Sequence, residues 1–195
     1  MRTPVFSFVR RSLLLLLLLT PLCARAEQAV ILFQTPDTKE ANAVTIELFP
    51  QDAPQTVANF VKLVRSGFYK GIVVHRTVAD TLVGAGDPLS KKKDRTAVGT
   101  GGPGYTLPAE INKHKHIRGA VAMAGLPTAI NPARASNGSQ FYIVLRPQPQ
   151  LDKEYTVFGQ VVGGLEFLDS LSRRGADSND YPQERIVIRS IEIKP

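Results

Sequence analysis

The chain has 195 residues, of which 43% are apolar and 21% are charged, and its mean hydropathy is −0.05. This is the composition of an ordinary globular protein, and it excludes a disordered, collagen-like or polytopic membrane chain. The formal net charge is +7, with one cysteine, three histidines and no tryptophan.

Residues 1–26 have the three parts of a secretory signal peptide. Arginines precede the apolar run Leu13–Leu19, and Ala24-Arg25-Ala26 follows it as an A-x-A cleavage site. The run is shorter than the roughly 20 residues that span a bilayer. We therefore predict cleavage after Ala26 and a periplasmic or secreted protein without stable membrane insertion. Cleavage removes the only cysteine and four arginines, which leaves a mature chain, residues 27–195, with a net charge of +3.

Short apolar segments separated by glycine and proline follow the signal. Ala29–Phe33 and Val44–Phe49 predict two paired strands. Asp52 is predicted to cap a helix with Pro54 in its first turn. Val57, Phe60, Val61 and Val64 recur there at helical spacing until Gly67 ends the helix. Many short strands with few helices indicate a β-barrel or a sandwich rather than a doubly wound α/β sheet. A second helix is predicted at Leu165–Leu171, and further strands at Gly71–Val74, Gly119–Met123, Phe141–Leu145, Thr156–Val162 and Ile186–Ile193.

Three patterns could indicate binding of a dinucleotide, a metal ion or a nucleic acid. In each case the surrounding sequence argues against that function. Gly99–Gly104 matches the dinucleotide fingerprint G-x-G-x-x-G, but no buried strand precedes it and no long helix follows. We interpret it as a loop whose glycines adopt unusual backbone angles. His114 and His116 do not share a helical face, so we expect no metal site and no other cofactor. Lys91–Lys93 lacks interleaved aromatic residues, so we expect no nucleic-acid binding.

The remaining motifs follow one another from Val30 to Ile193. They are Phe68–Arg76, Gly86-Asp87-Pro88, Gly99–Gly102, Met123-Ala124, Ser139–Tyr142 and Val157–Gly159. In these motifs the chain resembles the cyclophilins, a family of peptidyl-prolyl cis-trans isomerases. The resemblance implies a single domain over residues 27–195. It also implies a mainly β fold, namely a closed eight-stranded antiparallel barrel capped by two α-helices.

Isomerisation of an X–Pro bond breaks no covalent bond, so the catalyst needs neither a nucleophile nor a metal. Amide resonance sets a barrier of roughly 18–20 kcal/mol, and the catalyst must bind the twisted amide more tightly than the planar one. A donor near the imide nitrogen does this, because twisting frees the nitrogen lone pair. An arginine suits the task, since it stays protonated and its planar group can be held in one orientation.

The resemblance assigns this role to Arg76. It implies that Gln140 contacts the substrate backbone, and that Tyr142 takes the place of a phenylalanine in the proline pocket. At Gly125 the implied contact with substrate is made by the backbone N–H group. The other residues that it implies in substrate binding are Leu82, Leu151 and Tyr155.

Two departures from the family pattern concern catalysis. Thr81 stands where the family usually has a pocket phenylalanine, and Gly84 replaces the glutamine that normally orients the arginine. Two hypotheses therefore stay open: an isomerase that assists the folding of exported proteins, and a peptide-binding or chaperone module of the same fold with weak or no turnover. Both bind proline-containing peptides and unfolded exported proteins, and we expect a monomer.

Overall fold

The structure, a computed structural model, describes residues 27–195. The predicted signal peptide, residues 1–26, lies outside this part of the chain. Within residues 27–195, none of the helices combines the length and the apolar character needed to cross a membrane.

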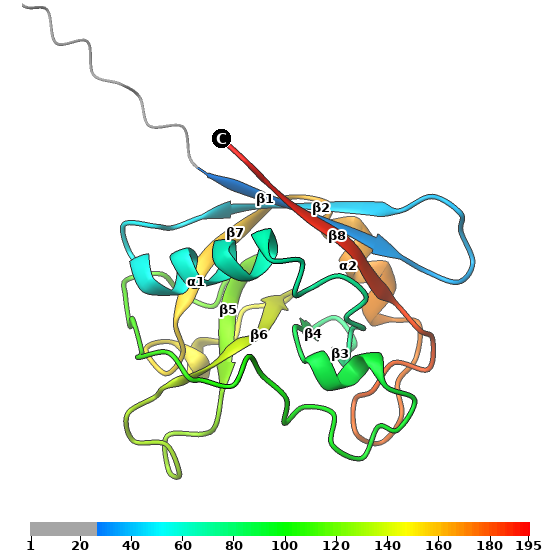
Figure 1. Cartoon of the computed structure of the whole chain (residues 1–195). Coiled ribbons are helices and arrows are strands. Elements are labelled where there is room, and N and C mark those ends of the chain that lie inside the picture. The colour runs from blue at the N-terminus through cyan, green and yellow to red at the C-terminus, as the bar shows by residue number, and fades with distance from the viewer. Residues whose placement is uncertain (1–26) are drawn as a thin grey trace, which may run out of the picture.

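Eight antiparallel strands form one curved sheet with the spatial order β3-β4-β6-β5-β7-β2-β1-β8 (Figure 1). Burial alternates along the first two strands, and Ile31 lies opposite Val44 in their register. This confirms the predicted pair of strands, the first expected from a continuous apolar run and the second from an alternating pattern. The strands are β1 Gln28–Gln34, β2 Asn42–Leu48, β3 Arg76–Val78, β4 Leu82–Ala85, β5 Ala120–Gly125, β6 Ser136–Val144, β7 Val157–Gly163 and β8 Val187–Lys194.

The expectation of a closed barrel was wrong, because the sheet is an open half-barrel. Its end strands are β3 and β8, and they do not pair with each other. The free edge of β8 instead accepts the segment before β3: Gly71 N–H donates to the Ile188 carbonyl, and Ile188 N–H donates to the Ile72 carbonyl, both at 2.8 Å. The predicted strand at Gly71–Val74 makes only an isolated bridge there. The chain then turns into β3, which has three residues and leaves β8 unpaired along most of that edge.

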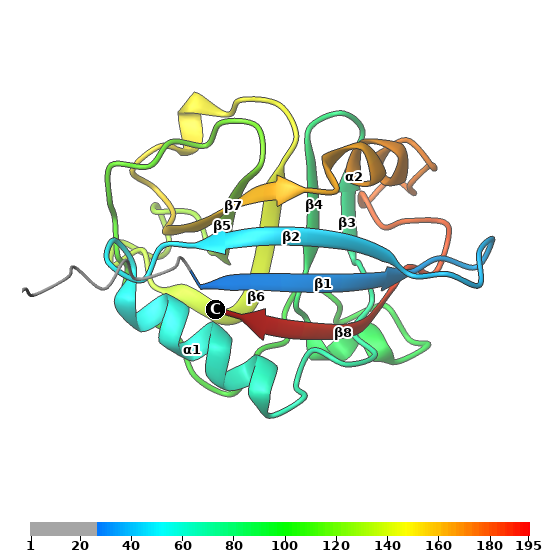
Figure 2. The same ribbon diagram turned by 90° about the horizontal axis from the view of Figure 1, so that it is seen from above.

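Two helices lie at opposite ends of the half-barrel, α1 Pro54–Arg65 and α2 Leu165–Ser172 (Figure 2). Asp52 does not cap α1 as predicted: its carboxylate bonds His114 Nε2 at 2.9 Å. The first N–H groups of α1 donate instead to the Glu110 carboxylate, from Gln55 at 2.9 Å and from Thr56 at 2.8 Å. A carboxylate at a helix N-terminus satisfies orphan donors and interacts favourably with the helix dipole.

Aromatic side chains from α1, β6 and β7 meet in the centre of the core. The Phe60 ring of α1 lies 5.9 Å from the Phe141 ring and 5.4 Å from the Phe158 ring, between centroids. Tyr69 completes the cluster, with its ring 5.3 Å from that of Phe60. Aromatic rings at these separations bury large apolar areas. This packing holds α1 on the sheet beneath β6, the strand that carries several of the predicted site residues.

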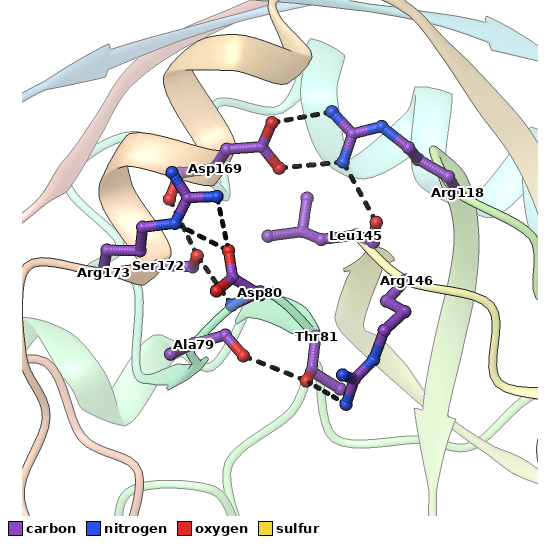
Figure 3. Close-up of polar contacts among 9 residues, drawn as sticks. All are labelled: Ala79, Asp80, Thr81, Arg118, Leu145, Arg146, Asp169, Ser172 and Arg173. Carbon is purple, nitrogen blue, oxygen red and sulfur yellow. Dashed lines mark hydrogen bonds and ion pairs between the residues drawn. The ribbon is translucent and has the colours of Figure 1, made fainter.

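Polar contacts tie the end of α2 to the β3–β4 turn (Figure 3). Arg173 Nε donates to Asp80 Oδ1 at 2.7 Å, and the Asp80 N–H donates to Ser172 Oγ at 3.2 Å. On the next turn of α2, Asp169 accepts two hydrogen bonds from Arg118, at 2.8 and 2.7 Å. These contacts join α2 to the β3–β4 turn and to Arg118, which precedes β5.

Candidate active site

One cleft of about 1050 Å³ lies beside the β3–β4 hairpin and β6. One of its walls is part of the long connection between β4 and β5, which contains the glycine loop. All seven predicted site residues line this cleft: Arg76, Leu82, Gly125, Gln140, Tyr142, Leu151 and Tyr155. They come from five different regions of the chain, and only the fold brings them together.

Arg76 begins β3 and lies opposite Gly84 on β4. Its side chain is 55% exposed, and its guanidinium contacts the carboxylate of Asp180, from the loop between α2 and β8. The Nε and Nη2 atoms of Arg76 donate to the same oxygen of Asp180, Oδ2, at 3.3 and 3.2 Å. The guanidinium therefore keeps three of its five N–H donors free for another partner.

Gln140 is buried on β6, and its amide group holds the glycine loop. Its Nε2 atom donates to the carbonyl oxygens of Gly99, at 2.9 Å, and Gly101, at 2.7 Å. Because both amide hydrogens are used in this way, the group that Gln140 can offer a substrate is its carbonyl oxygen, an acceptor for a peptide N–H.

Asp87 holds the same loop from inside the fold and was not predicted as a site residue. Its fully buried carboxylate accepts hydrogen bonds from the N–H groups of Leu89, Gly99 and Gly101. A Cβ on Gly101 would lie 2.1 Å from Asp87 Oδ1, and Gly99 has a φ of +94°. The prediction of unusual backbone angles in this loop is thus confirmed, and the glycines wrap a carboxylate of the protein itself.

Tyr142 carries the end of a buried hydrogen-bonded chain. Its hydroxyl oxygen lies 3.0 Å from His116 Nε2, and His116 Nδ1 lies 3.2 Å from Asp152 Oδ1. Burial raises the pKa of the Tyr142 hydroxyl and lowers the pKa of His116. With His116 neutral, all three groups are satisfied when its Nδ1–H donates to the Asp152 carboxylate and its Nε2 accepts from the Tyr142 hydroxyl. This chain holds the Tyr142 ring against the cleft.

The apolar part of the cleft lies next to Tyr142. Leu82, on β4, is 9% exposed, and Leu151 ends a short 3₁₀ helix. The Tyr155 ring meets the Tyr142 ring edge to face, with the centroids 6.1 Å apart. Thr81, in contrast, is in the β3–β4 turn, where its hydroxyl donates to the Ala79 carbonyl, and it does not line the cleft. At this position the chain therefore supplies no side chain to the cleft wall.

Sequence reasoning missed three residues that organise the cleft: Asp87, His116 and Asp180. Asp87 was noted as part of the Gly86-Asp87-Pro88 motif, but no role was predicted for it. His116 was considered only as a metal ligand. Nothing in the local sequence around Asp180 indicates that it would contact an arginine 104 positions earlier.

The curved eight-stranded half-barrel carries a cleft that combines an apolar pocket with a guanidinium group, which is the make-up of a ligand-binding site. The family model "Cyclophilin type peptidyl-prolyl cis-trans isomerase/CLD" matches residues 32–193. The chain belongs to this family of enzymes.

Relatives and solved structures agree with this assignment. The chain is 42% identical over 136 residues to peptidyl-prolyl cis-trans isomerase B of Bacillus subtilis, covering 69% of this chain and 86% of the relative. It is 38% identical over 151 residues to a peptidyl-prolyl cis-trans isomerase of Helicobacter pylori, covering 75% and 84% of the two chains. A Cryptosporidium parvum cyclophilin-type isomerase, crystallised in the presence of the dipeptide Ala-Pro, superposes with a TM-score of 0.72 at 30% identity. That match covers 86% of this chain and 99% of the other.

Proposed function

We propose that the cleft isomerises X–Pro bonds of exported proteins with Arg76 as the catalytic residue. The observation that carries this proposal is that a guanidinium, a buried glutamine and an apolar pocket line the same cleft. The proline ring occupies the pocket beside Leu82 and Tyr142, and the carbonyl oxygen of Gln140 accepts a hydrogen bond from the substrate backbone.

The free N–H donors of Arg76 then face the imide nitrogen. In the planar amide this nitrogen is a poor acceptor, because its lone pair is delocalised into the carbonyl group. In the twisted state the lone pair is available, so the hydrogen bond is stronger in the transition state than in either ground state. This differential binding lowers the barrier without covalent chemistry.

The test is exchange spectroscopy by NMR on a peptide with one Ala–Pro bond, using residues 27–195 of the protein. We expect Arg76→Lys to reduce catalysed exchange by about 10²-fold, a typical effect of removing one preorganised donor. The melting curve should be unchanged, because the Arg76 side chain is largely exposed. Equal exchange rates for wild type and Arg76→Lys would refute the catalytic role of Arg76. Peptide-induced shifts without any exchange would instead favour the binding-module hypothesis.

The export part of the proposal rests on residues 1–26. The charged start, apolar run and A-x-A site favour cleavage after Ala26 and release into the periplasm or the medium. Mass spectrometry of the protein isolated from its native compartment should give an N-terminus at Glu27. A full-length protein retained in the membrane would contradict this expectation.

A further inference from the structure

The Arg76 guanidinium has a partner that the sequence did not indicate. Across the hairpin, where relatives of the family have an orienting glutamine, this chain has Gly84, directly opposite Arg76. Glycine has no side chain and cannot donate to or accept from the guanidinium. The carboxylate of Asp180 instead approaches from the other side of β3, and its Oδ2 atom accepts from both Nε and Nη2 of Arg76.

Asp180 is held in place by its backbone. The Thr77 N–H, next to Arg76 in β3, donates to the Asp180 carbonyl at 2.8 Å. Asp180 has a φ of +61°, a left-handed conformation that aspartate tolerates better than most residues. The surrounding turn is fixed by Asp177, whose carboxylate accepts from the N–H groups of Asn179 and Tyr181. The hydrogen bond from Thr77 to Asp180 therefore fixes the distance between β3 and the Asp180 segment independently of the side chains.

We propose that Asp180 is the positioning residue for Arg76 and that it orients the guanidinium in place of the missing glutamine. The inference rests on the proposed catalytic role of Arg76. Asp180 orients the guanidinium plane through Nε and one edge, and leaves the remaining N–H donors directed to the substrate. It touches no reacting atom.

This role is distinct from a contribution to stability. Both side chains are substantially exposed, 55% for Arg76 and 42% for Asp180, and exposed ion pairs contribute little to stability. Orientation has a much larger effect on catalysis, because a small displacement of a catalytic group slows the reaction strongly. Removal of the Asp180 side chain should therefore lower the turnover number and leave the melting curve almost unchanged.

The chain contains a matched control for this experiment. Asp80 also has a left-handed backbone, with a φ of 54°, and it pairs with Arg173. Like the Arg76–Asp180 pair, this ion pair joins the β3–β4 hairpin to the segment that follows α2. Its ion pair is similarly exposed, but neither partner lines the cleft. Asp180→Gly and Asp80→Gly both remove an exposed carboxylate at a backbone conformation that glycine adopts readily. They differ in which arginine loses its partner.

We expect Asp180→Gly to lower kcat by about tenfold with KM within about twofold of wild type, as for a misaligned donor. Asp180→Asn, which keeps a neutral acceptor at the same place, should recover part of the loss. Asp80→Gly should stay within about twofold of wild type, as expected of a surface change away from the cleft. In the Arg76→Ala background, Asp180→Gly should cause no further loss, because the two residues act as one unit.

A second readout is independent of activity. In ¹H–¹⁵N spectra, the Arg76 Nε–H signal, assigned by its disappearance in Arg76→Lys, should shift in Asp180→Gly and stay in place in Asp80→Gly. Equal turnover for the two glycine variants, or faster turnover for Asp180→Gly, would overturn the positioning role. If Arg76→Ala itself were as active as wild type, the proposed function would fail first, and the two failures are thereby distinguished.

Discussion

The Nε2 atom of His116 lies 3.0 Å from the hydroxyl oxygen of Tyr142, and the imidazole and phenol rings are nearly parallel, at 17°. The His116 side chain is fully buried, and its other nitrogen bonds Asp152. The tyrosine that stands in the place of a family phenylalanine is thus matched by a buried acceptor for its hydroxyl. The extra polar atom near the pocket is satisfied internally.

We predict that Tyr142→Phe lowers the stability of the protein. Its effect on catalysis should be much smaller than that of Arg76→Lys. The ring, which makes the apolar contact, is retained. The buried His116 Nε2 loses its partner, and an unsatisfied buried polar atom costs about 1–3 kcal/mol. Urea unfolding measures the free energy of unfolding. The control is Tyr155→Phe, which removes a hydroxyl with no hydrogen bond within residues 27–195. Equal stability of the two variants would show that the His116 contact is not formed.

Stability should fall when the pH is lowered from 7.5 to 5.5. Burial lowers the pKa of His75 and of His116 below the ordinary 6.5. The unfolded chain therefore binds protons on these histidines before the folded protein does, and acidification below about pH 6.5 favours unfolding. The pKa values of the Asp52, Asp152 and Asp169 carboxyls lie below the ordinary 3.8, so these groups stay ionised over this window. Their protonation lowers stability only at more acidic pH. Urea midpoints that are constant or rise on acidification over this window would contradict the prediction.

Glu110 should be a stability residue, although it is far from α1 in the sequence. Its carboxylate accepts from the N–H groups of Gln55 and Thr56 at the start of the helix. Loss of a helix cap costs about 0.5–2 kcal/mol, and we expect Glu110→Ala to lower the free energy of unfolding by this amount. Glu110→Gln keeps one acceptor oxygen, so its free energy of unfolding should lie between those of wild type and Glu110→Ala. A Glu110→Ala protein as stable as wild type would mean that water caps α1 equally well.

Restoring the family glutamine at Gly84 should not speed the enzyme. The backbone there admits a side chain, but a Cβ would lie 3.2 Å from the Cβ of Arg76, so Arg76 must shift. Because Asp180 already orients the guanidinium, that shift should lower kcat. Gly84→Ala, which adds the Cβ without the amide, separates crowding from hydrogen bonding. Faster turnover in Gly84→Gln than in wild type, with Gly84→Ala slower, would show that Arg76 lacks an orienting partner in the native protein. NMR exchange rates provide the measurement.

Local patterns were sufficient for the elements with a regular buried face. A continuous apolar run predicted β1, and alternation predicted β2. The helical spacing of Val57, Phe60 and Val61 predicted α1, because such a pattern reports which side of its own segment is buried. The same reasoning missed β3 and β4. β3 has only three residues, and all four residues of β4 are buried, so neither shows an alternating pattern.

Contacts between distant segments were decided by the tertiary structure alone. The sequence by itself determined that a strand, a glycine loop and an arginine are present, and through its motifs it indicated the family. It did not determine that β8 pairs with Gly71–Val74 rather than with β3, or that Glu110 caps α1. Nor did it determine that Asp180 holds Arg76. Periodicity records the environment of one segment, whereas these pairings depend on how turns bring two segments together, and many different residues could make them.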